Sequence, residues 1–293
     1  MNLPLCLWLW SRAVLKGDRV EMIVHEPFLA LGEGTWKQSG AAIIHRLMVA
    51  VLLMASSHIW VTIPEWERLL RPYAYGRRLP FTWLPVASNI PVCDEPTGRK
   101  AVRELYAERG ELVVGHFGTY GAHVRNILMG TVPTLMKNSE GISLLLMGRG
   151  SEALRDAVID EYPDLARCIH ATGELNSVEL SRAVKACDVM LQPYPDGISS
   201  RRTSAMTALS HGIPVVTTSG HLTESFWAQS GAVAIVPSDD TAGLVNITQR
   251  LLRDIAAREK MGAAAKRLYL EHFDISRTIH KLCAASTVSL DKY

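Results

Sequence analysis

The sequence lacks the marks of several common protein classes. Its five cysteines among 293 residues are scattered, without a CxxC pair or a histidine at metal-ligand spacing: Cys6, Cys93, Cys168, Cys187 and Cys283. An odd number of dispersed cysteines argues against a disulfide framework and against a zinc site. No GxSxG motif and no Walker loop is present either. The cysteines are therefore predicted to be reduced thiols, and hydrolase or NTPase chemistry finds no support.

The sequence has no excess of charge of one sign. Lys and Arg number 31 and Asp and Glu number 29. A net charge so close to zero provides no general attraction for nucleic acid. We therefore expect no nucleic-acid partner, and any anion must be bound by a local site.

Long uninterrupted apolar runs are also missing. The apolar stretch at 47–63 contains Ser56, Ser57 and His58, which leaves it short of the about 20 residues that a span requires. It is interpreted as a buried helix followed by a strand. The apolar start lacks a basic region and a clear cleavage site, which argues against a signal peptide. Trp8 and Trp10 leave peripheral membrane contact open.

From residue 111 onward, short β-branched runs alternate with helical stretches. Strands are predicted at 111–117, 142–148, 168–173, 188–193, 213–218 and 232–237, and helices at 123–137, 152–162, 177–186, 202–211, 239–254 and 256–271. Continuous apolar strands separated by helices are typical of a parallel sheet that is covered on both faces. This pattern predicts a doubly wound α/β domain.

The first part of the chain is less regular. We expect strands at 19–28 and 58–64, helices at 40–55 and 65–75, and an extended, proline-rich connection at 81–96. The predicted organisation is a partial N-terminal α/β domain at 1–95 with a linker at about 81–107. A Rossmann-like domain follows at 108–273, and a C-terminal helix at 274–293 crosses back to the N-terminal half.

Four predicted loops are expected at one edge of the C-terminal sheet. They are GTYG (118–121), GRGS (148–151), TGELN (172–176) and PDGISSRR (195–202). Ligands of doubly wound sheets bind outside the carboxyl ends of the strands, where helices begin. Glycine lets backbone N–H groups approach an anion, and a helix N-terminus favours negative charge. The alternative is that the glycines are only turn residues.

The stretch PDGISSRR combines several candidate functional groups. Asp196 at the end of a strand could accept hydrogen bonds from polyol hydroxyls, and Gly197 would allow close backbone approach. Ser199 or Ser200 is a candidate N-cap for the following helix. The same residues could instead be ordinary loop polar groups in solvent.

Arg201 and Arg202 stand at the start of that helix, the wrong end for a cation. An anion must offset this cost, and a bidentate guanidinium contact to phosphate is the obvious candidate. By contrast, His116, His170 and His211 have no partner carboxylate at a diagnostic spacing. They are interpreted as partly buried, neutral histidines rather than acid/base groups.

These motifs resemble a known family. GHFGTY, LLLMGRGS, ATGEL, CDVMLQPYPDGISSRR and HGIPVVTTSG look like glycosyltransferase family 4, whose members are retaining and use nucleotide sugars. The likeness covers about 108–283 and extends loosely to VHEPF and LPVASNIPV. It implies an α/β protein of GT-B type, with a complete C-terminal doubly wound, Rossmann-like domain and a shortened N-terminal α/β half.

The resemblance also implies roles for residues. Gly118 and Thr119 would contact the donor diphosphate, Arg149 would lie near it, and the 170–175 region, including Gly173, would line the nucleobase. Asp196 would meet the donor sugar.

The loop at 195–202 and the N-terminal half complete the implied site. Gly197, Ser199, Arg201 and Arg202 would bind the nucleotide. His25 and Glu26 match the place where members carry a cleft histidine or acid, although they could equally form a structural pair.

The chain departs from the family at two donor-binding positions. Members have a glutamate that takes the ribose hydroxyls. Counting from Asp196 places Ser204 there, and aligning on the GxPVV strand places Thr207 there, and neither residue is acidic. Thr119 replaces one basic residue, and His123 or Arg125 could serve as the other.

The expected activity is glycosyl transfer from a nucleoside-diphosphate sugar to an unknown acceptor, with no bound metal or cofactor and in the cytoplasm. Two alternatives stay open: a nucleotide-sugar-binding remnant or partner subunit, and a sugar-nucleotide epimerase. A short N-terminal half would leave apolar surface for self-association, a partner chain or the inner membrane face.

Overall fold

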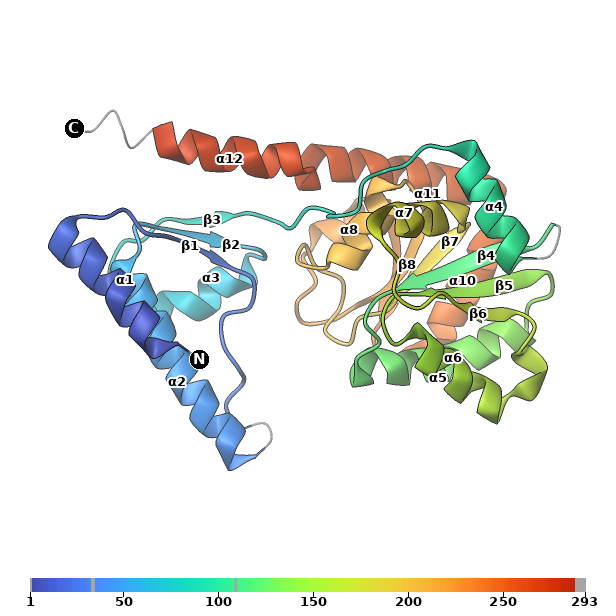
Figure 1. Cartoon of the computed structure of the whole chain (residues 1–293), viewed down its shortest axis with the longest axis horizontal. Coiled ribbons are helices and arrows are strands. Elements are labelled where there is room, and N and C mark those ends of the chain that lie inside the picture. Colours follow the sequence, from blue (N-terminus) through green and yellow to red (C-terminus); the bar gives the residue numbers. More distant parts are fainter. Residues whose placement is uncertain (1, 33–34, 108–109, 288–293) are drawn as a thin grey trace. The chain divides into compact units, whose positions relative to one another are not determined.

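The computed structural model describes residues 2–32, 35–107 and 110–287. The chain divides into two compact units, Met1–Pro85 and Val86–Tyr293 (Figure 1). The last part of the predicted C-terminal helix, 288–293, lies outside the described residues.

The second unit contains a six-stranded parallel sheet. Its strands are β4 (Leu112–Phe117), β5 (Ile142–Met147), β6 (Ile169–Ala171), β7 (Val189–Gln192), β8 (Val215–Ser219) and β9 (Val233–Pro237). Their order in the sheet is β6-β5-β4-β7-β8-β9. From β4 the chain adds β5 and β6 on one side. It then crosses to the other side of β4, where it adds β7, β8 and β9. The point where the strand order reverses therefore lies between β4 and β7, and the predicted doubly wound arrangement is confirmed.

Helices cover both faces of this sheet (Figure 1). They are α4 (Pro96–Tyr106), α5 (Ala122–Lys137), α6 (Ser151–Glu161), α7 (Ser177–Ala186), α8 (Thr203–Ser210), α9 (Phe226–Gln229), α10 (Thr241–Arg253) and α11 (Ile255–Leu268). Helix α12 (Ile275–Thr287) follows the sheet domain and packs against the segment Tyr269–Phe273. Short 3₁₀ and π segments lie at Pro163–Leu165 and Tyr269–Phe273. Helix α5 packs against α6 and α10, whereas α4 packs against α7, and α8 against α11. All six residues of β5 are buried, as expected for a strand that is covered on both faces.

The first unit contains a smaller parallel sheet. Strands β1 (Glu21–Val24), β2 (His58–Val61) and β3 (Phe81–Trp83) lie in the order β1-β2-β3. Helix α2 (Trp36–Ala55) connects β1 to β2, while α3 (Glu65–Leu70) and a 3₁₀ turn at Arg71–Ala74 connect β2 to β3. Helix α1 (Leu3–Lys16) packs against α2. Successive right-handed crossovers in one direction place the connecting helices on the same face of a sheet, as Figure 1 shows for this unit.

Two predictions about 81–107 were wrong. Phe81–Trp83 forms a strand beside β2 rather than an extended connection, and Pro96–Tyr106 forms α4. Proline is compatible with the first turn of a helix because the N–H that it lacks would have no partner there. The prolines between 80 and 96 suggested an irregular connection, although they border a short strand and the start of a helix.

Helix α2 begins earlier, and is less buried, than predicted. Thr35 and Gln38 form a reciprocal capping box that starts the helix at Trp36. The helix and the following strand are confirmed, but α2 buries mainly Ala42, Val49, Ala50, Leu53 and Ala55. Among the described residues, it is the one helix that is long and apolar enough to cross a membrane.

His116 and His211 are fully buried, more deeply than predicted, and His170 is partly buried, as predicted. Burial lowers the pKa of all three. Burial lowers the pKa of His116 to about 4, and its Nδ1 lies 2.7 Å from the Leu191 carbonyl oxygen. Burial likewise lowers the pKa of His211 to about 4. The His211 ring joins α8 to α7, since its Nε2 lies 2.8 Å from Ser181 Oγ and its Nδ1 lies 2.7 Å from the Thr207 carbonyl oxygen.

The lowered pKa values of His116 and His211 lead us to expect a loss of stability in mild acid. Between pH 6.5 and about pH 4, both histidines are protonated in the unfolded chain but stay neutral in the folded chain. The free energy of unfolding should therefore fall by about 1.4 kcal/mol per pH unit for each histidine, down to about pH 4. Urea unfolding across this range should show a shallower pH dependence in His116→Gln and in His211→Gln, compared with the exposed control His221→Gln. Equal slopes in all three variants would contradict the assignment.

Candidate functional site

The predicted loops meet at the carboxyl edge of the six-stranded sheet. A cavity of about 440 Å³, here called the carboxyl-edge pocket, is lined by residues of 118–121, 148–151 and 172–176 and by Thr203 and Ser204 at the start of α8. The fourth loop, 195–202, contributes no lining residue. The lining residues of the pocket are Ile90, Phe117, Gly118, Thr119, Gly148, Arg149, Glu174, Leu175, Leu180, Thr203 and Ser204. Except for Ile90, the lining residues end β4 or follow β4, β5, β6 and β7. The pocket therefore lies at the reversal of strand order, where doubly wound sheets bind ligands.

The loops around this pocket are tied together by backbone contacts. Gly148 has a φ of 103°, and a Cβ at this position would stand 2.4 Å from the Gly118 carbonyl oxygen. The Gly148 N–H donates to the Gly173 carbonyl over 3.0 Å, and the Gly173 N–H donates to Ser151 Oγ over 3.0 Å. Glycine at 148 therefore lets two loops approach closely, which is more than a turn requirement.

Three helices that begin at or shortly after the pocket lining have no side-chain cap. The N-cap residues of α5, α6 and α8 are Gly121, Gly150 and Arg202, and no side chain bonds the first-turn N–H groups. Helices α7 and α10, by contrast, are capped by Asn176 and Asp240. Uncapped first-turn N–H groups together with the helix dipole favour an anion. These N-termini favour negative charge beside a pocket whose lining carries one arginine, Arg149, and one glutamate, Glu174.

The anion beside the paired arginines belongs to the chain itself. Arg201 and Arg202 each donate from Nη2 to the carboxylate of Asp196. The Arg202 guanidinium also lies 4.7 Å from the centre of the Tyr194 ring. Asp196 therefore offsets the cations at the start of α8 by accepting from both guanidinium groups.

Tyr194 connects this cluster to the pocket. Its hydroxyl lies 2.8 Å from Ser204 Oγ. Burial raises the pKa of Tyr194 to about 12, so the phenol keeps its proton at neutral pH. Ser204 is thus held at the pocket wall by a neutral hydrogen bond, at the position where the family resemblance leads one to expect a carboxylate.

The N-cap prediction for Ser199 and Ser200 was wrong. Helix α8 begins at Thr203 with Arg202 as its N-cap, and both serines are fully buried. The Ser200 N–H lies 3.1 Å from Oε1 and 3.2 Å from Oε2 of Glu224, and the Ser200 hydroxyl also donates to Oε1. Ser200 therefore bonds the β7–α8 loop to Glu224 instead of capping the helix.

Sequence reasoning missed Glu224. Burial raises the pKa of its carboxyl, even though Ser200 donates to it and Trp227 Nε1 donates to it over 2.8 Å. This carboxylate joins the β7–α8 loop to the segment after β8. A lone glutamate followed by aromatic residues in the sequence gave no signal of that contact.

Gly197 is required by the same junction. It has a φ of 87°, and a Cβ there would stand 2.1 Å from Thr223 Oγ1 and 2.3 Å from the Gly220 nitrogen. Gly197 does allow a close backbone approach, as predicted, but in this structure the approaching group is Gly220 of the same chain. The glycine fixes the loop that presents Asp196 and the arginines.

Other predicted residues lie apart from the pocket lining. Arg125 is on α5, and its Nη1 donates to the Ala153 carbonyl over 3.4 Å. His25 and Glu26 follow β1 in the N-terminal unit and are both exposed. Their predicted catalytic roles stay predictions. Among the described residues, no group of three or more His, Cys, Asp or Glu could hold a metal ion.

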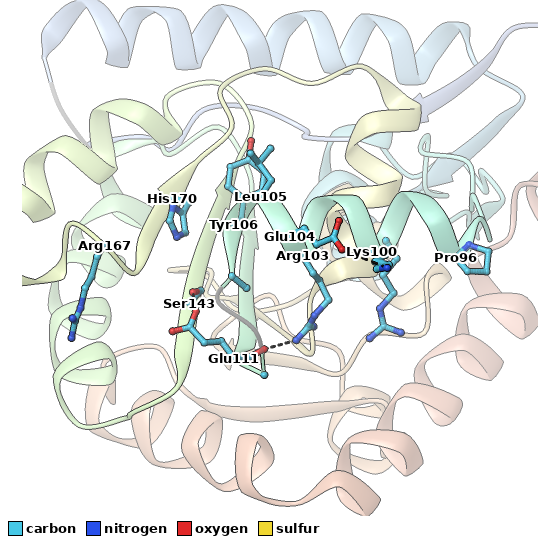
Figure 2. Close-up of a pocket in the computed structure, with 13 residues that line it drawn as sticks. Pro96, Lys100, Arg103, Glu104, Leu105, Tyr106, Glu111, Ser143, Arg167 and His170 are labelled. Carbon is cyan, nitrogen blue, oxygen red and sulfur yellow. Dashed lines mark hydrogen bonds and ion pairs between the residues drawn. The ribbon is translucent and has the colours of Figure 1, made fainter.

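A larger cavity of about 940 Å³ lies at the opposite edge of the sheet, at the amino ends of β4, β5 and β6. Figure 2 shows its lining, with Arg103 bonded to the Glu111 backbone and Ser143 beside Glu111. Arg103 also pairs with Asp188 at 2.8 Å. Arg103 thus ties α4, which supplies much of the cavity wall, to the sheet. Size alone therefore does not make it the functional site.

Comparison with known structures identifies the architecture. Sucrose-phosphate synthase from Thermosynechococcus elongatus has a TM-score of 0.75 at 19% identity, over 98% of this chain and 73% of that one. Anabaena HepE in complex with UDP and glucose has a TM-score of 0.69 at 15% identity, over 98% and 76%. WaaG, a glycosyltransferase involved in lipopolysaccharide biosynthesis, has a TM-score of 0.60 at 15% identity, over 94% and 80%. The fold is that of the GT-B glycosyltransferases.

Sequence comparison points the same way for the C-terminal domain. Residues 111–254 match the family model described as Glycosyl transferases group 1. A phosphatidyl-myo-inositol mannosyltransferase from Mycobacterium leprae is 26% identical over 147 residues, which is 49% of this chain and 38% of that relative. The match thus spans well under half the length of this curated relative. Together with the fold, these matches make the C-terminal domain similar to group 1 glycosyl transferases.

The close approach of Gly197 to Gly220 leads us to expect that adding one methyl group at position 197 lowers the stability of the protein. Gly197→Ala should destabilise the protein through both its positive φ and the clash with Gly220, whereas Gly231→Ala meets only the backbone cost, because no atom lies within 4 Å of a Cβ there. Positive φ costs about 1–2 kcal/mol and overpacking about 1–3 kcal/mol more. Urea unfolding of both variants measures the difference in the free energy of unfolding. Equal destabilisation would show that Gly220 and Thr223 move away from the added methyl group at little cost.

Proposed function

We propose that this protein transfers a glycosyl unit from a nucleoside-diphosphate sugar to an acceptor, with retention of anomeric configuration, as a family 4 glycosyltransferase. The observation that carries the proposal is the carboxyl-edge pocket, which is lined by Arg149 and by the first two residues of α8. Its other loops lead into α5 and α6, and none of these three helices has a side-chain cap. Such N-termini bind phosphate groups through backbone N–H donors. The nucleoside diphosphate would bind here.

The dimensions and lining of the pocket suit this ligand. A volume of about 440 Å³ falls within the range of about 300–1,000 Å³ that is typical of small-molecule sites. Leu175 and Leu180 offer apolar surface to a nucleobase, and Glu174 and Ser204 offer oxygen atoms to ribose hydroxyls. Structural neighbours support the donor class, because HepE has been solved with UDP and with UDP-glucose.

Arg202 is proposed to contact the diphosphate. Its side chain is 23% exposed, whereas that of Arg201 is 7% exposed, so Arg202 is the more accessible of the two. The Arg202 Nε is buried and has no hydrogen-bond partner among the described residues. A small rotation could direct this donor to a phosphate while Arg201 keeps its bond to Asp196. Positive charge fixed at the leaving group would stabilise the charge that develops on the departing diphosphate.

Two other activities are distinguished by one assay. An epimerase would convert the nucleotide sugar without any acceptor, and a remnant or partner subunit would bind the nucleotide without turnover. Incubation of the donor sugar with and without acceptors separates the three cases. Anomeric coupling constants of the transferred sugar then test retention.

Arg202→Ala should weaken nucleoside diphosphate binding about 10- to 100-fold, because a charge-assisted contact contributes about 1.5–3 kcal/mol. Nucleoside binding should change little, since the nucleoside has no anion. Calorimetric titrations with UDP, GDP and ADP, and with the matching nucleosides, measure both values. Arg155→Ala, which removes a surface arginine paired with Asp156, is the matched control. An equal loss for nucleoside and diphosphate would assign Arg202 to the scaffold.

A further inference from the structure

Helices α1 and α2 expose an unusual amount of apolar surface. Of its fourteen residues α1 buries Cys6 alone. The exposed fractions reach 81% for Trp36, 76% for Leu15 and 55% for Trp8. Contiguous exposed apolar patches on proteins mark interaction sites, because leaving such side chains in water is costly.

The exposed residues of α2 form one stripe. Trp36, Ile43, Leu47 and Met54 are separated by seven, four and seven residues, a spacing that places them on the same side of a helix. Ala42, Val49 and Leu53 are buried on another side. Since α1 packs against α2, we call the exposed apolar surface of the two helices the α1–α2 face.

The charge of this face is of one sign. The segments Leu3–Lys16 and Trp36–Ala55 contain four basic residues and no Asp or Glu. They are Arg12, Lys16, Lys37 and Arg46. Arg12 pairs with Asp18, outside the helix. Lys16, Lys37 and Arg46 form no ion pair within the described part of the chain.

Exposed apolar residues together with basic residues favour an anionic membrane over a second copy of the chain as the partner of this face. A second copy would bring the same cations against each other, because a twofold interface pairs a surface with itself. An anionic bilayer surface offers acyl chains to the leucines and isoleucines, headgroup depth to the tryptophans and negative charge to the lysines. The buried side of α2 packs within its own unit, so the helix suits a position along a bilayer surface rather than across it.

We propose that the α1–α2 face docks the protein on membranes that contain anionic lipids. Trp8, Trp36, Ile43 and Leu47 enter the interface, and Lys16 and Lys37 pair with headgroups. The proposal is independent of the donor site, because it concerns residues of the N-terminal unit alone.

Co-sedimentation of the full chain with vesicles tests the docking. We expect binding to phosphatidylcholine vesicles that contain phosphatidylglycerol, weaker binding to pure phosphatidylcholine, and release at high salt. Each lysine near an anionic surface contributes about 1 kcal/mol, or about fivefold. The double variant Lys16→Glu/Lys37→Glu should therefore lower partition by about 25-fold or more.

A second pair of variants separates apolar insertion from misfolding. Ile43→Ser/Leu47→Ser should reduce binding at unchanged circular dichroism. The control Ile255→Ser/Lys260→Glu changes an exposed apolar residue and an exposed lysine of the C-terminal unit and should leave binding intact. Brominated lipids should quench tryptophan fluorescence.

Three outcomes would overturn the proposal: no binding to anionic vesicles at low salt, equal loss in the control variant, or binding that is insensitive to both helix variants. A stable dimer by light scattering without vesicle binding would assign the face to self-association instead.

Discussion

The ion pairs between the Asp196 carboxylate and the guanidinium groups of Arg201 and Arg202 fix the loop between β7 and α8. Two cations at a helix N-terminus oppose the helix dipole, and the carboxylate removes that cost. Glu224 and Gly197 hold the same loop from the side of β8. The position of Thr203 and Ser204 at the carboxyl-edge pocket depends on this arrangement.

The two edges of the sheet show how topology separates binding from support. At the carboxyl edge, helices α5, α6 and α8 begin without side-chain caps beside the reversal of strand order. At the amino edge, the Arg103 guanidinium donates to the Asp188 carboxylate and to the backbone carbonyls of Glu111 and Ala186. The smaller cavity thus has unused donors for an anion, whereas the larger one has charges that already hold α4 in place.

The C-terminal fold could be predicted because its strands are short apolar runs separated by helices, and Gly118, Thr119, Arg149 and Ser204 were found from the strand-end rule and the family resemblance. The partners of Arg201 and Arg202 could not be predicted, since they depend on how the loop turns back on Asp196. Glu224 and Ser200 are 24 residues apart in the sequence, and no local pattern joins them.

Hydrogen–deuterium exchange tests the central claim most directly, namely that the carboxyl-edge pocket binds a nucleoside diphosphate. The full chain is compared with and without UDP, GDP or ADP, using the nucleotide that raises its melting temperature most. The account predicts slower exchange in 118–124, 148–152, 173–176 and 197–206, with no change in 96–106 or 167–170. Slower exchange confined to 96–106 and 167–170, or no change with any of the three nucleotides, would contradict it.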